Sequence, residues 1–162
     1  LSGGRGHRGP CACDSANRPG PGIDRMGVGT PSVIQMTALE GALKVWDGVT
    51  MADSRAACVR LSELFIAEVE ARCPELTLAS PRDAAVRGSQ VSFAFEHGYA
   101  AMQAIVERGV IGDFRAPNIM RFGFTPLYLD ESDVHGAVDI MADVLSNRLW
   151  DNEKYKTVGR VT

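Results

Sequence analysis

The segment from Gln90 to Phe95 alternates large apolar side chains with small ones, and this pattern restricts the fold more than any other feature of the chain. Successive side chains of a β-strand point to opposite faces of a sheet, so the alternation predicts a strand with one buried face. The large side chains are those of Val91, Phe93 and Phe95. Such a strand needs a layer of other elements packed against it.

Helical patterns elsewhere in the chain predict that layer. A helix is expected from about Met51 to Arg72, because apolar residues recur there every three or four positions and Pro74 would stop it. A last helix is expected to begin near Asp130, a suitable N-cap residue with acidic residues after it. The apolar stripes consist of Leu61, Leu64, Phe65 and Val69 in the first helix, and of Val134, Ala137, Val138, Met141, Leu145 and Leu149 in the second.

The remaining segments complete an α+β order. A further helix is expected from Pro31, which suits a first helical turn, to Gly48, which would end it. A short helix closed by Gly109 follows the alternating strand. Other strands are expected at Thr77–Ala79, Val110–Phe114 and Ile119–Phe124. The resulting order predicts the α+β class, or α/β in the wider sense, with a small sheet covered by helices.

Composition argues against several functions. The chain has 162 residues, of which 45% are hydrophobic, enough to bury a core. With a net charge of −3 and no basic stripe, no nucleic-acid partner is expected. No apolar stretch is long enough to cross a membrane, so no membrane association is expected either. The first ten residues lack the apolar middle region of a signal peptide, so this segment does not indicate export.

The cysteines favour a reduced, cytoplasmic protein without a metal. Cys11 and Cys13 are closer together than the usual zinc-binding pair, and His7 does not complete a standard spacing. The other two cysteines are Cys58 and Cys73. No metal site is therefore expected, and reduced thiols are the simpler interpretation.

Arg121 is the residue most in need of an explanation. It lies in a strand-like, mostly apolar run between Val110 and Tyr128. A guanidinium in such a place requires a partner, because an unpaired buried charge is costly. Its planar fork suits a carboxylate held by two parallel hydrogen bonds. From the residues alone two partners stay open, an internal Asp or Glu, or the carboxylate of a ligand.

This run resembles the signature found near the C-terminus of kynureninases, enzymes that use pyridoxal 5'-phosphate (PLP). In that family the arginine matching Arg121 binds the α-carboxylate of the substrate. Arg87-Gly88-Ser89-Gln90 is similar to another family element, although a turn entering a strand explains it equally well. Gly29-Thr30-Pro31 resembles a loop that reaches the partner subunit's active site. The resemblance therefore implies that Gly29 and Thr30 contact the cofactor, and Thr30 also the substrate, unless Thr30 only caps the following helix.

The resemblance also implies an organisation and a reaction. It implies the C-terminal small domain of a fold-type I PLP enzyme over residues 31–150, preceded by a loop-rich remnant of the large domain in residues 1–30. Residues 151–162 are expected to form a flexible tail. The implied reaction is hydrolysis of L-kynurenine to anthranilate and L-alanine in tryptophan degradation. A cytoplasmic homodimer is implied, because the family shares its active site between subunits.

The chain also departs from the family pattern. Gly4 stands where the family has a tryptophan that contacts the cofactor phosphate, so that contact would be lost. Cys11 and Cys13 replace phenylalanines, which suggests gene decay or a sequencing error. The only lysines are Lys44, Lys154 and Lys156, and none is expected to form the Schiff base with PLP. We therefore expect a fragment that is inactive alone.

The alternatives are a small domain of another class V PLP enzyme, such as a cysteine desulfurase, and a non-catalytic module.

Overall fold

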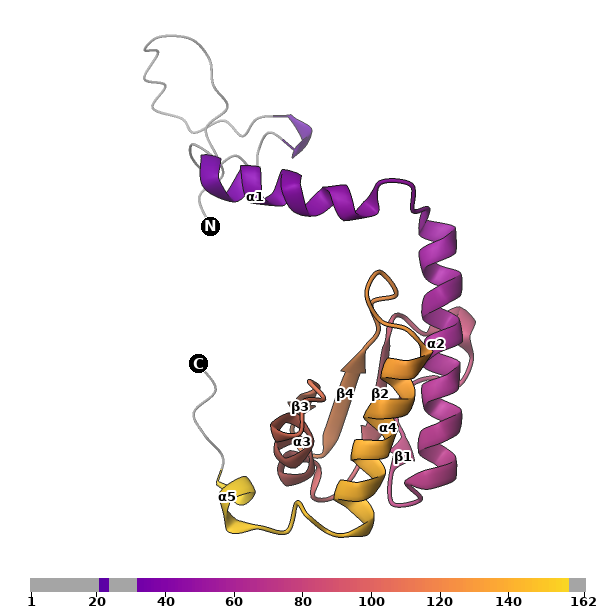
Figure 1. Cartoon of the computed structure of the whole chain (residues 1–162), viewed down its shortest axis with the longest axis vertical. Helices are drawn as coiled ribbons and strands as arrows, with labels where there is room; N and C mark the ends of the chain where they lie inside the picture. The colour runs from indigo at the N-terminus through magenta and orange to yellow at the C-terminus, as the bar shows by residue number, and fades with distance from the viewer. Residues whose placement is uncertain (1–20, 24–31, 158–162) are drawn as a thin grey trace. The chain divides into compact units, whose positions relative to one another are not determined.

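The structure, a computed structural model, describes residues 21–23 and 32–157 of the chain (Figure 1). The chain divides into two compact units, Leu1–Asp47 and Gly48–Thr162. The first unit contains helix α1 (Val33–Leu43) and the short 3₁₀ helix η2 (Lys44–Trp46). The helix predicted between Pro31 and Gly48 is thus present. Gly48 follows it with a positive φ of 81°, a conformation that favours glycine.

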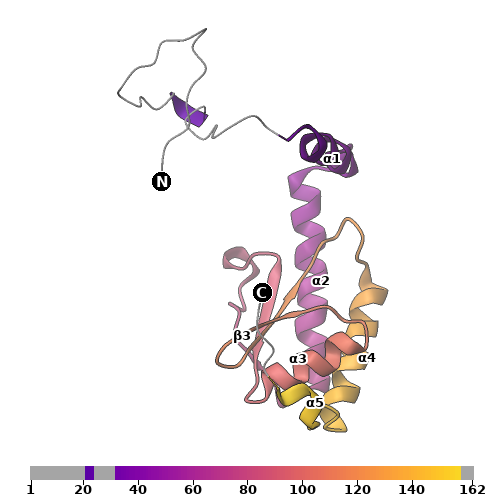
Figure 2. The ribbon, with the colours of Figure 1, turned by 90° about the vertical axis from the view of Figure 1, so that its left-hand side faces the viewer.

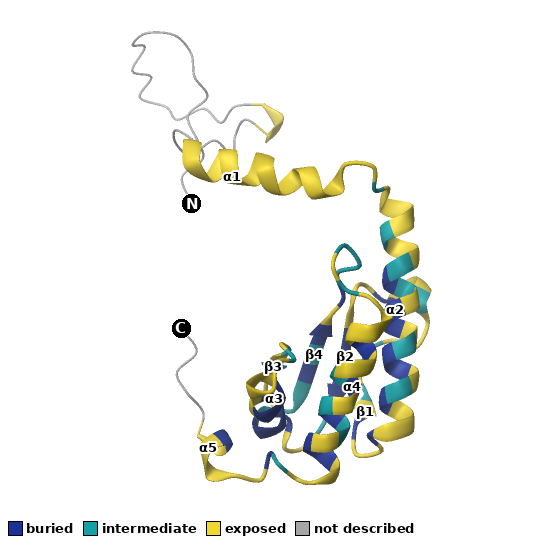
Figure 3. Ribbon diagram, in the orientation of Figure 1, coloured by how far each residue is buried: buried dark blue, intermediate teal, exposed yellow. Residues whose placement is uncertain are grey.

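Helix α1 has no buried residue, and Figure 3 shows it exposed along its whole length. Its apolar side chains are distributed around the helix rather than gathered on one face. They include Val33, Ile34, Met36, Leu39 and Leu43. A helix that is apolar on all sides is typical of one covered by other protein.

The second unit is built on a four-stranded antiparallel sheet with the order β1-β2-β4-β3. The strands are β1 (Thr77–Leu78), β2 (Gln90–Ala94), β3 (Asp113–Arg115) and β4 (Ile119–Gly123). The helices are α2 (Met51–Arg72), η3 (Ala84–Val86), α3 (Gly98–Glu107), α4 (Glu131–Ser146) and α5 (Glu153–Lys156). Helix α2 packs along α4, and α3 contacts α4, β3 and β4 (Figures 1 and 2). The predicted α+β class, with a small sheet covered by helices, is confirmed.

The register of β2 and β4 separates the two faces of the sheet. Val91 pairs with Phe122 and Phe93 pairs with Met120, and all four side chains are buried. Residues directly opposite each other in an antiparallel pair point to the same face, so these pairs form the core face. The intervening pairs, Gln90 with Gly123 and Ser92 with Arg121, belong to the opposite face. We call this second side the polar face of the sheet.

The core face is held against α2 mainly by Phe65. The Phe65 ring lies 5.2 Å from the rings of Phe122 and Phe124, and 6.0 Å from that of Phe93, measured between centroids. Such tilted and edge contacts between aromatic rings add to the free energy gained by burying their apolar area. The predicted stripe of α2 therefore faces the sheet, with Leu61, Phe65 and Val69 buried.

Helix α4 begins as its sequence predicts. The Asp130 carboxylate accepts hydrogen bonds from the backbone N–H groups of Ser132 and Asp133, and the Asp133 carboxylate accepts one from the backbone N–H of Asp130. This capping box satisfies donors that the first helical turn leaves without partners. Leu149 lies beyond the end of α4, so the predicted stripe is shorter in the structure than in the sequence pattern.

Within the segment predicted as a flexible tail, the short helix α5 contacts α3. The Tyr155 side chain is buried, and its hydroxyl donates a hydrogen bond to the Glu107 carboxylate of α3. Lys154 Nζ lies 2.9 Å from the same carboxylate. These contacts fix α5 on α3, whereas residues 158–162 lie outside the described part of the chain. None of the helices in residues 32–157 is both long and apolar enough to cross a bilayer.

Candidate functional site

Three polar side chains form a row across the polar face of the sheet. Arg121 in β4 lies directly opposite Ser92 in β2 on one side and Asp113 in β3 on the other. The row therefore crosses three adjacent strands and points away from the aromatic core. The rigid backbone ladder of the sheet fixes these residues relative to one another, as a binding site requires.

Arg121 makes an ion pair within the sheet. Its Nη2 donates a hydrogen bond to Asp113 Oδ2, and Arg115 Nη2 lies 3.3 Å from the same oxygen atom. The Arg121 side chain is 28% exposed, against 49% for Asp113 and 62% for Arg115. The internal partner that the sequence left open is thus Asp113, and the guanidinium still reaches the surface.

Part of the Arg121 guanidinium is not used by this pair. Its Nε atom is buried and has no hydrogen-bond partner among the described residues. A guanidinium has five N–H donors, and the described contacts with Asp113 occupy only one nitrogen. Of the other donors, Nη1 is not buried and makes no hydrogen bond to the described residues, so it can bind a second carboxylate.

The electrostatics of the site favour an anionic ligand. The hydrogen bond from Arg121 lowers the pKa of Asp113, burial opposes the shift, and the charge of Arg115 adds to it. Asp113 is therefore ionised at neutral pH. Two guanidinium groups and one carboxylate leave a net charge of +1 on this cluster, which a ligand carboxylate would neutralise.

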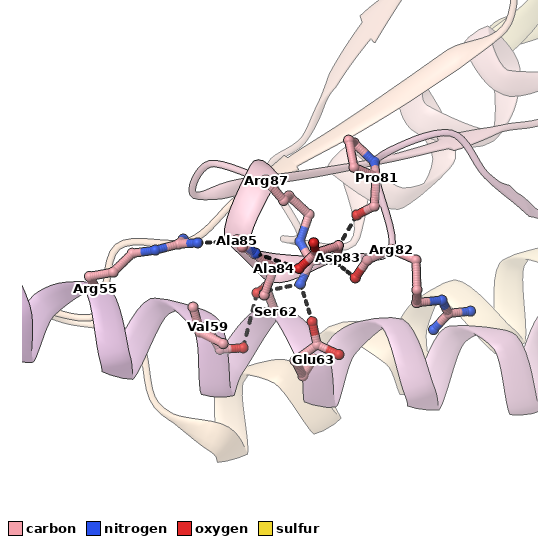
Figure 4. A network of polar contacts seen from close by, with 10 residues as sticks. All are labelled: Arg55, Val59, Ser62, Glu63, Pro81, Arg82, Asp83, Ala84, Ala85 and Arg87. Carbon is pink, nitrogen blue, oxygen red and sulfur yellow. Dashed lines mark hydrogen bonds and ion pairs between the residues drawn. The ribbon is translucent and has the colours of Figure 1, made fainter.

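Arg87 lies in a different place and makes a different kind of contact (Figure 4). Its side chain is only 2% exposed and forms an ion pair with Glu63 of α2. Its Nη1 donates to the backbone carbonyls of Pro81 and Arg82, at 2.8 Å and 2.9 Å. Arg87 therefore links the loop before β2 to α2. The sequence alone predicted only a turn entering a strand at this position.

The other predicted site residues are either outside the described residues or at the surface. Gly4, Gly29 and Thr30 lie outside the described residues, as do Cys11 and Cys13, so their assignments stay predictions. Lys44 is exposed on η2, and Lys154 and Lys156 form surface ion pairs with Glu107, Asp151 and Glu153. A Schiff-base lysine needs a shielded pocket, which none of these three occupies. The described residues therefore do not by themselves fit PLP.

Sequence comparison connects this site with a family. Residues 54–141 match the sequence model of the kynureninase C-terminal domain, and this range contains the whole sheet. The chain belongs to the kynureninase family. Kynureninase of Burkholderia mallei (strain SAVP1) is 44% identical over the whole chain, as is that of Burkholderia pseudomallei (strain 1106a). Kynureninase of Pseudomonas fluorescens is 43% identical over the same span.

The chain spans 39% of the length of these curated relatives. The family match covers Arg121 together with Asp113 and Ser92, two residues to which sequence reasoning gave no role. A signal for Asp113 was present, because Asp113 and Arg121 lie four residues before and four residues after Pro117, which stands between the predicted strands Val110–Phe114 and Ile119–Phe124. In a hairpin centred on that proline, such residues are expected to face each other.

Proposed function

We propose that this chain provides the domain that binds the substrate carboxylate in a kynureninase, the enzyme that hydrolyses L-kynurenine to anthranilate and L-alanine. The observation that carries the proposal is Arg121, a guanidinium fixed in the middle of a sheet with donors left for a ligand. Family membership supports it, because the relatives that match the whole chain are named kynureninases.

In this proposal Arg121 binds the α-carboxylate of L-kynurenine through two parallel hydrogen bonds. The planar fork of arginine matches a carboxylate in a way that a lysine ammonium does not. A carboxylate held at two points restricts rotation about the substrate Cα. The reacting bond is then presented in one orientation, which lowers the entropic part of the activation barrier.

The cofactor of the proposed enzyme is PLP, which acts as an electron sink when bound. We assign its Schiff base and most of its binding surface to parts of the enzyme other than residues 32–157, because the three lysines of the chain are exposed or paired at the surface. The chain alone is therefore expected to be inactive. The exposed apolar helix α1 is consistent with a place inside a larger assembly, which we propose is a cytoplasmic homodimer.

Gly29 and Thr30 belong to this proposal as residues that reach the cofactor, and Thr30 also the substrate, across the dimer. Gly4 marks the family tryptophan position, where the contact with the cofactor phosphate would be lost. A non-catalytic module is the alternative that the surface positions of the three lysines favour. One experiment separates the two functions.

Residues 1–162 would replace the matching part of the Burkholderia mallei kynureninase, and anthranilate formation from L-kynurenine would be followed by its fluorescence. A second chimera would carry Gly4→Trp, Cys11→Phe and Cys13→Phe in addition. We expect anthranilate from the second chimera, and a weaker or absent signal from the first because the phosphate contact is missing. A soluble, dimeric second chimera that binds PLP but forms no anthranilate would support the non-catalytic module.

A further inference from the structure

Asp113 is an unusual neighbour for a residue that binds carboxylates, because it already offers a carboxylate to Arg121. The two residues lie directly opposite each other in the β3–β4 ladder, so their contact is fixed by the register of the sheet. Residues opposite each other in an antiparallel pair have neighbouring Cβ atoms, and a short Asp side chain reaches a guanidinium from that position. The pair is therefore part of the sheet rather than a chance surface contact.

The same carboxylate also neutralises repulsion between two arginines. Arg115 and Arg121 both approach Asp113 Oδ2. If the Asp113 charge were removed, two guanidinium groups would remain on neighbouring strands with no carboxylate between them. Like charges in neighbouring positions of a sheet are destabilising, so the Arg121 side chain would be free to leave its position.

The contact with Asp113 also orients the guanidinium. A flexible arginine side chain loses rotamer freedom when it is fixed in one geometry. In this protein Asp113 fixes it before any ligand arrives, and Nη1, which is not buried, makes no hydrogen bond to the described residues. A ligand carboxylate then meets donors that are already oriented, which strengthens its binding.

We propose that Asp113 is a positioning residue for Arg121, holding the guanidinium so that its free donors meet the substrate α-carboxylate, with Arg115 leaving the cluster at a net charge of +1. This inference rests on the proposed function, because Arg121 must first be the carboxylate ligand. Asp113 itself contacts Arg121 and Arg115, and acts on the substrate only through them.

The test compares two substrates in the chimera that carries Gly4→Trp, Cys11→Phe and Cys13→Phe. The measured quantity is the ratio of kcat/KM for L-kynurenine to kcat/KM for its α-carboxamide, which keeps the shape of the substrate but lacks the negative charge. For Asp113→Asn we expect this ratio to fall about tenfold or more, mainly through a higher KM for L-kynurenine. For Asp113→Glu, which keeps the charge, we expect a smaller loss.

The matched control is Asp139→Asn. Asp139 is a surface aspartate of α4 that pairs with Arg72 at 2.6 Å, so the variant removes an equivalent aspartate–arginine contact away from the polar face. Its ratio should equal that of the unchanged chimera. A general loss of folding would lower kcat/KM for both substrates together and leave the ratio unchanged, and thermal unfolding of the 162-residue chain reports such a loss separately.

The outcomes separate the two proposals. If Arg121→Ala leaves the ratio unchanged, the proposed carboxylate-binding role itself is wrong. If Arg121→Ala abolishes the preference for the acid but Asp113→Asn keeps it, Arg121 binds the carboxylate without help from Asp113 and the present inference is overturned. A reduced ratio in both variants, with the control unchanged, supports the positioning role.

Discussion

Asp113 and Arg121 face each other across β3 and β4, and their side chains form an ion pair on the face of the sheet that points away from the aromatic core. The pair holds the arginine in place and leaves part of its guanidinium available to a ligand. The backbone ladder fixes the position of the arginine, while the partly exposed guanidinium keeps donors for a second carboxylate. The guanidinium charge is thus held at a defined place in the sheet.

Arg87 should be essential for the stability of the second unit. Replacing it by methionine would leave the carbonyls of Pro81 and Arg82 without their buried donor and would break the ion pair with Glu63. We expect the free energy of unfolding of the 162-residue chain to fall by about 2–4 kcal/mol. Urea denaturation followed by circular dichroism measures the change. The control Arg82→Met removes an exposed pair with Glu70 and should change stability by less than about 1 kcal/mol.

The N-cap of α4 gives a smaller and more local effect. Asp130→Ala removes the carboxylate that accepts from the backbone N–H groups of Ser132 and Asp133, and should lower the free energy of unfolding by about 1 kcal/mol. Asp130→Asn should retain most of the stability, because an amide oxygen also caps a helix. Equal losses in the two variants would show that the charge near the helix dipole, rather than the hydrogen bonds, stabilises this terminus.

Cys73 should make the protein less stable in alkali. Burial raises the pKa of its thiol from 9.0 to about 11, the charge of Glu75 adds to the shift, and that of Arg72 opposes it. Below pH 9 the thiol is protonated in both the folded and the unfolded chain, so its contribution to stability is fully present. Above pH 9 the unfolded chain releases the proton more readily, and this contribution is lost as the pH rises to about 11.

The measurement is the free energy of unfolding between pH 8 and pH 11 for the unchanged chain and for Cys73→Ala. We expect the unchanged chain to lose more stability over the window from pH 9 to pH 11 than the variant does, because alanine has no proton to release. Parallel curves for the two proteins would mean that the thiol ionises as easily in the folded chain as in the unfolded one.

Much of the fold follows from local patterns in the sequence. The alternation around Phe93 predicted a strand, and the stripe of α2 predicted the helix that covers it, because both periods reflect a single buried face. The α4 N-cap was also predictable, since Asp130 and Asp133 stand at the spacing of a capping box. These features depend on residues that are close together in the chain.

Other features depend on pairs of residues that are distant in the sequence. The buried Tyr155 hydrogen-bonds to Glu107 of α3, a contact that no local pattern in the sequence indicates. Arg87 was similarly ambiguous, because its partner Glu63 lies in a different element. For Arg121 the sequence left an internal acid and a ligand as alternatives. The structure supplies the internal acid, Asp113, and leaves donors for the ligand.

The most direct test of the account is kcat/KM for L-kynurenine in the chimera that carries Gly4→Trp, Cys11→Phe and Cys13→Phe, compared with its Arg121→Ala and Arg121→Lys variants. We expect kcat/KM to fall by at least about a hundredfold for alanine and about tenfold for lysine, because lysine keeps the charge but loses the fork. Arg60→Ala, which removes an exposed arginine paired with Glu131, serves as the control and should retain full activity. If Arg121→Ala folds normally and loses less than tenfold, Arg121 does not bind the substrate carboxylate and the central claim is wrong.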